Sequence, residues 1–167
     1  MELFNVGDVV KYGVNGICRV SDITLRDFLG EKMEYYVLTP IDDRDMTYFV
    51  PTKNENLTSK MQYILSKDEL FKLVGEAKDL KSEWIDSDKV RADVFGKILV
   101  SKDRRDLIAL VRTIRDKKVE LEAGGKKLHA VDERILHDAM RIIDGEFAAV
   151  LGIKPKEVGG VIEEMFK

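Results

Sequence analysis

The sequence predicts an α+β protein of two domains, because two residue periodicities follow one another along its 167 residues. Residues 1–58 contain short β-branched and aromatic segments separated by turn residues, which is the pattern of antiparallel strands. From residue 66 onward, apolar residues recur at helical spacing. We therefore expect a small SH3/Tudor-like antiparallel β-barrel in residues 1–58. An all-α bundle of about five helices should follow in residues 66–167.

Four strand segments are expected in the first domain: Val9 to Tyr12, Ile17 to Ile23, Tyr35 to Leu38, and Thr47 to Val50. Turn signals separate them at residues 13–16, 29–31 and 41–45. The dipeptide Asn15-Gly16 favours positive φ and predicts a tight turn. Four or five strands within so short a stretch indicate a strongly bent sheet.

The helices are expected from capping residues and apolar periodicity. Ser66 and Glu69 form the pattern of a capping box, and an apolar face follows them. Further helices are expected at about 87–100, from Asp103 to Gly124, and from about 129 to 151, where Gly152 is a natural left-handed cap. A last helix begins near Pro155 and should bury Val158, Val161, Ile162, Met165 and Phe166.

Charge differs between the two parts of the chain. Residues 1–58 hold six basic and ten acidic residues, whereas residues 59–167 hold 22 basic and 21 acidic residues. Within the second part, the stretch from 97 to 118 is locally basic, with eight basic residues against three aspartates. Either a solvated helix face or a surface that faces phosphates has this pattern, and charge alone favours the solvated face.

No catalytic or cofactor motif stands out. The chain has no Walker A sequence, no G-x-G-x-x-G and no G-x-S-x-G. On one helix, His129 and His137 lie about 12 Å apart along the axis, too far for one metal ion. Cys18 is the single cysteine, which suits a reducing compartment. We expect a cytoplasmic protein that is not an enzyme and has no cofactor, metal or membrane segment.

The single tryptophan, Trp84, lies in the polar stretch SEWIDSDKVR. An isolated aromatic residue is usually part of a core, so packing between two helices is one explanation. Presentation to a partner is the other.

Two further stretches show a family pattern: FNVGDVVKYGVNGICRV at 4–20 and EYYVLTPIDDRDMTYFVPTKN at 34–54. Together with Trp84, KVRADVFGKILVSKDRRDLIALVRTI at 89–114, KKLHAVDERIL at 126–136 and EFAAVLGI at 146–153, they cover most of the chain. In this order, the segments resemble the CarD family of bacterial transcription regulators, of the Firmicutes type. A related first module occurs in transcription-repair coupling factors.

The resemblance implies a function for each domain. The N-terminal module is expected to bind the β subunit of RNA polymerase, and the helical domain to contact promoter DNA at the upstream edge of the transcription bubble. The family tryptophan, here Trp84, is expected to wedge into the minor groove and stabilise the open complex. No membrane or small-molecule partner is implied.

Site residues follow by the same resemblance. Lys89, Arg91 and Arg134 are expected to contact DNA phosphates near Trp84, although Asp86 and Asp88 lie close by. For polymerase, Arg26 matches a basic contact residue of the family, and Phe49 stands at a second such position. Phe28 is expected there for a different reason, because it is an apolar residue at a polar hairpin tip. The alternative for Phe28 and Phe49 is that both close the core of the barrel.

Three other functions compete with this one. A protein–protein adaptor would bind polymerase or another partner without DNA contact. An enzyme would need a polar cleft with convergent ionisable groups. A DNA-bending protein would bind duplex DNA tightly without polymerase.

Overall fold

The computed structural model describes residues 3–101 and 103–165, and it also leaves the side chains of Glu163 and Met165 undescribed. The chain divides into two compact units, Met1–Ile64 and Leu65–Lys167. The first unit contains the strands and the second the long helices, which confirms the α+β class with about five helices. Phe166, expected in the last helix, lies outside the described residues.

The first unit is a five-stranded antiparallel sheet in the order β4-β3-β2-β1-β5. The strands are β1 (Val9–Tyr12), β2 (Ile17–Phe28), β3 (Glu31–Pro40), β4 (Tyr48–Pro51) and β5 (Met61–Tyr63). The short helices η1 (Gly13–Asn15) and α1 (Glu55–Thr58) complete the unit. Because β5 belongs to the sheet, the unit extends past residue 58.

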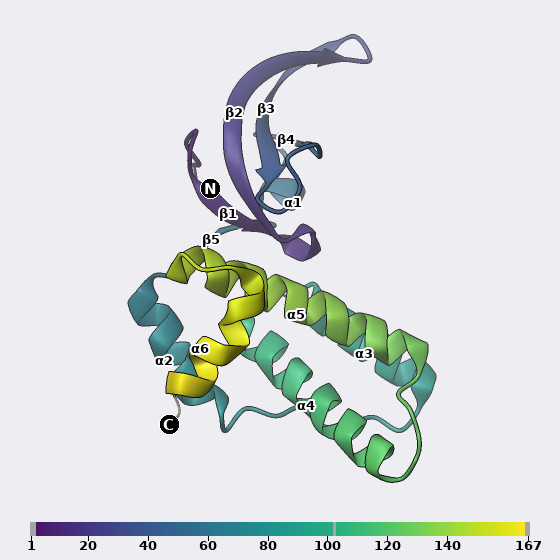
Figure 1. Ribbon diagram of the computed structural model, residues 1–167. Coiled ribbons are helices and arrows are strands. Elements are labelled where there is room, and N and C mark those ends of the chain that lie inside the picture. The colour runs from purple at the N-terminus through teal and green to yellow at the C-terminus, as the bar shows by residue number, and fades with distance from the viewer. Residues whose placement is uncertain (1–2, 102, 166–167) are drawn as a thin grey trace. The chain divides into compact units, whose positions relative to one another are not determined.

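The sheet is bent but not closed into a barrel. Among the described residues no ladder joins β4 to β5, so these two strands are its edges. A register shift between Val20 and Asp22 marks an irregularity in β2, a feature that bends strands. Figure 1 shows β2 and β3 as long, strongly curved strands.

One face of the sheet forms the core of the unit. Its buried members are Phe4, Val10, Tyr12, Cys18, Val20, Tyr36, Leu38, Val50 and Met61. These residues come from all five strands and from the segment before β1, so the core fixes the curvature of the sheet.

The second unit has helices α2 (Lys67–Ala77), α3 (Asp88–Leu99), α4 (Arg104–Ala123), α5 (Ala130–Leu151) and α6 (Val158–Met165), with η2 (Pro155–Glu157) before α6. Figure 1 shows α3, α4 and α5 running alongside one another, with α2 and α6 at one end of this group. One apolar cluster centres on Phe95, Leu110, Ile114 and Ile142. A second lies among α2, α4, α5 and α6 and includes Leu70, Ile108 and Phe147.

Capping residues at the helix ends explain why the helix boundaries can be predicted from the sequence. The side chains of Ser66, Ser87 and Asp103 each accept a hydrogen bond from a backbone N–H of the first turn. Gly152 adopts the left-handed conformation that ends α5. At Ser66 the expected box is only half formed, because Glu69 accepts a hydrogen bond from the Ser66 hydroxyl group.

Candidate functional sites

The segment before α3 is fixed to α4 by a buried threonine. The backbone N–H of Ser82 donates to Oγ1 of Thr113 at 2.8 Å. The same hydroxyl group lies 3.0 Å from the carbonyl oxygen of Ser82 and 2.8 Å from that of Ala109. Beside it, Lys81 and Asp116 form an ion pair at 3.0 Å. The chain two residues before Trp84 therefore has a defined position.

Arg91 fixes the same segment from α3. Its guanidinium group donates to the carbonyl oxygen of Ile85 at 2.8 Å and to both oxygens of Asp132 at 2.9 and 2.8 Å. A further bond of 2.7 Å reaches Asp88. Because the side chains of Arg91 and Asp132 are both almost completely buried, this is an internal ion pair. The hydrogen bond to Asp132 raises the pKa of Arg91, and the bond from Arg91 lowers the pKa of Asp88.

Trp84 lies between these two anchors and is half-buried. Its ring meets Phe95 edge to face, with 5.9 Å between the ring centroids. The guanidinium carbon of Arg91 is 4.3 Å, and Nζ of Lys117 is 5.5 Å, from the centroid of the Trp84 ring. Both distances fall within the range of cation–π contacts. The indole is therefore packed against the helical core without being sealed inside it.

An open cavity of about 190 Å³ adjoins the indole. Its lining consists of Lys81, Ser82, Trp84, Thr113, Asp116, Lys117 and Glu120. The lining is mostly polar, and its two cations are each paired with an acid of the same lining, Lys81 with Asp116 and Lys117 with Glu120 at 3.2 Å. The indole therefore adjoins an open, polar cavity whose charges are balanced.

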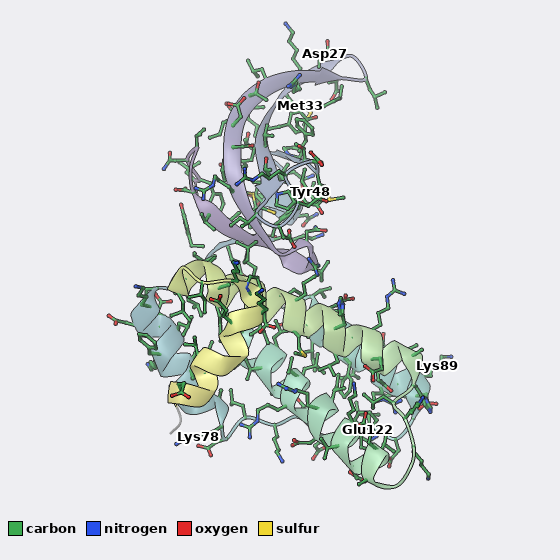
Figure 2. All side chains as sticks on the ribbon, in the orientation of Figure 1. Asp27, Met33, Tyr48, Lys78, Lys89 and Glu122 are labelled. Atoms are coloured by element: carbon green, nitrogen blue, oxygen red, sulfur yellow. The ribbon has the colours of Figure 1, made fainter. Side chains whose placement is uncertain are left out.

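The three basic residues expected to contact DNA differ in exposure and in ion pairing. Lys89 and Arg134 are exposed, and neither has an ion pair with the described residues. Figure 2 shows Lys89 at the start of α3. Arg91, in contrast, is bound to Asp132 and Asp88, so its donors are already engaged. The structure thus brings Arg91 to Trp84, and no contact joins Lys89 or Arg134 to the indole among the described residues.

The basic stretch of α3 and α4 is largely paired inside the unit. Lys97 pairs with Asp93, Arg104 with Glu146, Arg105 with Glu76, and Lys118 with Glu133. These pairs favour the interpretation of this stretch as a structural and solvated surface.

Sequence reasoning missed three residues of the Trp84 site. Lys117 was one of many basic residues, and Asp132 had the appearance of an acidic residue in a first helical turn. Thr113 offered the clearest signal, because it is a polar residue next to Ile114 on the buried side of α4. A buried hydroxyl group usually has a hydrogen-bond partner.

The second candidate site lies on the sheet and contains all three residues expected at polymerase. The ring of Phe28 meets Phe49 at 5.6 Å and Tyr35 at 5.2 Å between centroids, edge to face in both pairs. The guanidinium carbon of Arg26 lies 5.9 Å from the centroid of Phe49. We call Arg26, Phe28, Tyr35 and Phe49 the aromatic face.

The strand register explains why these residues meet. Thr24 is opposite Tyr35, and Val37 is opposite Phe49, so alternate residues of β2, β3 and β4 share one side of the sheet. Phe28 is 46% exposed and Phe49 39% exposed, and neither is part of the buried core of the unit. Their exposure does not fit the alternative that both rings close the core of the sheet.

The hairpin of β2 and β3 extends beyond its neighbours. Its tip is the turn Leu29-Gly30, in which both residues have positive φ, at 58° and 88°. Such a turn suits the twist of a hairpin, but the left-handed conformation is unfavourable for leucine. Leu29 is fully exposed there. Figure 2 marks the nearby Asp27 on this projecting end of the sheet.

The distal part of the hairpin has free strand edges. In β2, residues 22–28 pair only with β3, and in β3, residues 31–33 pair only with β2, among the described strands. Free backbone donors and acceptors are the requirement for strand addition by a partner. The hairpin therefore combines a free edge, an aromatic face and an exposed leucine.

The fold and these two sites define an α+β protein with one sheet surface suited to a protein partner and one helical surface that presents an anchored indole. Residues 4–64 match the family model of the CarD-like/TRCF RID domain. The chain is 23% identical over 159 residues to "Putative transcription factor YdeB" of Bacillus subtilis (strain 168), a similarity that covers 93% of this chain and 97% of that protein.

Residues 4–64 are thus a domain of the CarD-like/TRCF RID family, and the resemblance to CarD proteins indicated by the sequence motifs is confirmed. Within the described residues no helix is long and apolar enough to cross a bilayer. The same residues contain no cluster of three or more His, Cys, Asp or Glu side chains that could hold a metal ion.

Proposed function

We propose that this protein is a CarD-like transcription regulator that binds the β subunit of RNA polymerase through residues 4–64 and stabilises the open promoter complex through its helical unit. The family of the first domain and the named relative support a role in transcription through polymerase. The observation that carries the DNA part is the half-buried Trp84, held between Thr113 and Arg91 next to an open cavity. Such a regulator involves no chemical step, and it acts in the cytoplasm, where polymerase and promoters are.

A fixed indole has a physical reason to favour melted DNA. Insertion into an intact duplex requires unstacking, which costs free energy, whereas the junction of a bubble has already lost that stacking. A group that binds the open form better than the closed form shifts the equilibrium towards the open form by its differential affinity. Because the ring responds to deformability more than to base identity, we expect weak sequence specificity in the minor groove.

The charges near Trp84 refine the expected phosphate contacts. Arg91 is internal, so we assign it the role of positioning the indole. Lys117, close to the indole ring, pairs with exposed Glu120 and not with a buried acid, so it is the better candidate for a phosphate contact. Lys89 and Arg134 remain candidates at the exposed surfaces of α3 and α5.

For polymerase, the aromatic face and the hairpin edge offer two modes of contact. Phe28 and Phe49 expose apolar rings beside Arg26, and aromatic residues and arginine are enriched in protein–protein interfaces. The free edge of β2 allows strand addition to a sheet of the β subunit. Recruitment by polymerase would then determine which promoters are affected.

One observation favours the second candidate, an adaptor that binds polymerase without DNA contact. Most basic residues of α4 are paired within the unit, and Asp86 and Asp88 are exposed close to Trp84. Such a surface would be a weaker ligand for DNA than an unpaired basic one.

Promoter melting distinguishes the two. Permanganate reactivity of thymines in the bubble is measured for polymerase on a promoter with an unstable open complex, with and without the full chain. We expect the protein to raise the melted fraction at unchanged polymerase occupancy. An adaptor would leave the melted fraction unchanged, and a DNA-bending protein would bind the duplex without polymerase.

A further inference from the structure

The helical unit contains a cavity that plays no part in the proposed contacts with polymerase or DNA. It has a volume of about 570 Å³ and lies among α2, α4, α5 and the η2–α6 segment. Pockets for small molecules typically have volumes of about 300–1,000 Å³. The cavity is therefore large enough for a ligand.

The lining of this cavity is mainly apolar. Val74, Ile108, Val111, Ile143, Phe147 and Ile162 contribute to it, and most of them belong to the adjoining apolar cluster. Contact between an aliphatic chain and this lining would remove apolar surface from water on both sides. The interior thus suits hydrocarbon.

Basic residues also line the cavity. Lys78 follows the end of α2, Arg112 and Arg115 are on α4, and Lys156 is in η2. Figure 2 labels Lys78 next to the end of α2. Arg112 donates to the carbonyl oxygen of Ala77, which fixes its side chain at the cavity.

Asp144 is the single carboxylate among these lining residues. Burial raises its pKa, although Arg115 acts in the opposite direction. Four cations therefore face one acid, and a ligand with a negative head group would complement the excess of positive charge.

We propose that this cavity binds a single-chain amphiphilic anion of the fatty-acid class. The hydrocarbon chain lies against the apolar lining, and the carboxylate group meets Arg115 and Lys156. A partner helix is the other occupant to consider, but four cations against one carboxylate in the lining favour a small ligand with an anionic head group.

The test is calorimetric titration of the full chain with decanoate below its micelle-forming concentration. We expect binding of one decanoate per chain. Decanol and decyltrimethylammonium, which share the chain length without the negative charge, should bind at least about tenfold more weakly, a difference of 1.4 kcal/mol. Equal affinity for decanol, or no binding of decanoate, overturns the proposal.

Two glycine variants locate the site. Gly159 lines the cavity, and a Cβ atom built on it meets no atom within 4 Å, so Gly159→Leu should fill space without disturbing the fold. Gly75→Leu is the matched control, because Gly75 is also helical and unobstructed but does not line the cavity. We expect Gly159→Leu to abolish decanoate binding and Gly75→Leu to retain it. Equal binding by both variants contradicts the proposed site.

Arg115→Gln tests the head group, and vesicles test the source of the ligand. The variant should weaken decanoate binding while leaving decanol binding unchanged. Binding only to anionic phospholipid vesicles, with no affinity for monomeric decanoate, would indicate a membrane surface and overturn the proposal. A partner helix as the true occupant would also appear as absence of decanoate binding.

Discussion

The guanidinium carbon of Arg91 lies 4.3 Å from the centroid of the Trp84 indole, while the same guanidinium group binds both oxygens of buried Asp132. A residue that the sequence suggested for phosphate contact is thereby part of the support for the indole. Since Asp132 is on α5 and Ile85 adjoins Trp84, Arg91 ties the segment that presents the indole to the helical core.

Loss of Arg91 should destabilise the helical unit. Arg91→Met leaves Asp132 buried without its partner, a change that typically costs about 3–5 kcal/mol. Trp84 is the single tryptophan, so its fluorescence during urea unfolding reports on this unit. Arg134→Met, an exposed control on α5, should change the free energy of unfolding by no more than about 0.5 kcal/mol.

The double variant Arg91→Met/Asp132→Leu tests the reason for that loss. Because it removes both buried charges, it should recover most of the stability that the single variant loses. A double variant as unstable as Arg91→Met would show that the missing ion pair is not the cause.

Charge reversal at the aromatic face should weaken polymerase binding. Arg26→Glu places a carboxylate beside Phe49, and we expect about a tenfold loss of affinity for the isolated lobe of the β subunit, measured by interferometry. Lys32→Glu is the matched control, since strand alternation puts Lys32 on the opposite side of the same hairpin. Equal effects of the two substitutions would contradict a specific role for the aromatic face.

The hairpin tip offers a variant in which stability and binding move in opposite directions. Leu29→Asn should stabilise the first unit by about 1 kcal/mol, because asparagine tolerates positive φ better than leucine. All five tyrosines lie in this unit, so their absorbance follows its unfolding. The same variant should lose affinity for polymerase, since it removes a fully exposed apolar side chain. If affinity is unchanged, Leu29 is not a contact.

Asp144 predicts a specific pH dependence. Its pKa in the folded protein is raised above 3.8, mainly by burial, so folding favours the protonated form. This contribution is complete below the unfolded pKa and is lost as pH rises through the folded pKa. Asp144→Asn should therefore be more stable than the parent at neutral pH, and the difference should vanish near pH 3.8, as urea unfolding at several pH values can check. A difference that is constant with pH would contradict this assignment.

The sequence predicts the elements whose signals are local. The boundaries of α3, α4 and α5 follow from cap residues such as Ser87, Asp103 and Gly152, which act within one turn. Strand β5 was not predicted, because its three residues, Met61–Tyr63, are too few to show the alternation of apolar and polar residues that marks a strand. It forms because β1 pairs with it from far away in the sequence.

The two candidate sites also differ in how far local sequence signals predict them. The aromatic face brings together Arg26, Phe28 and Phe49 because strand register places them on one side of the sheet, and their contact with polymerase stays a prediction. Arg91 shows the opposite case, since its partner Asp132 lies 41 residues away and no local pattern reveals the pair.

The lifetime of the open complex tests the proposed role of Trp84. Trp84→Ala removes the ring that stacks at the bubble edge, and base–aromatic stacking contributes about 1–3 kcal/mol. Phe71→Ala is the matched control, because Phe71 is an exposed aromatic residue on α2 without a contact to Trp84. Far-UV circular dichroism should show that both variants remain folded.

The decisive measurement is the decay of polymerase–promoter complexes after a heparin challenge, with each variant at saturating concentration. We predict that Trp84→Ala shortens the lifetime about tenfold relative to the parent, whereas Phe71→Ala leaves the lifetime unchanged. Both variants should bind polymerase with the affinity of the parent. A lifetime with Trp84→Ala equal to that of the parent would contradict a role for the indole at the bubble edge.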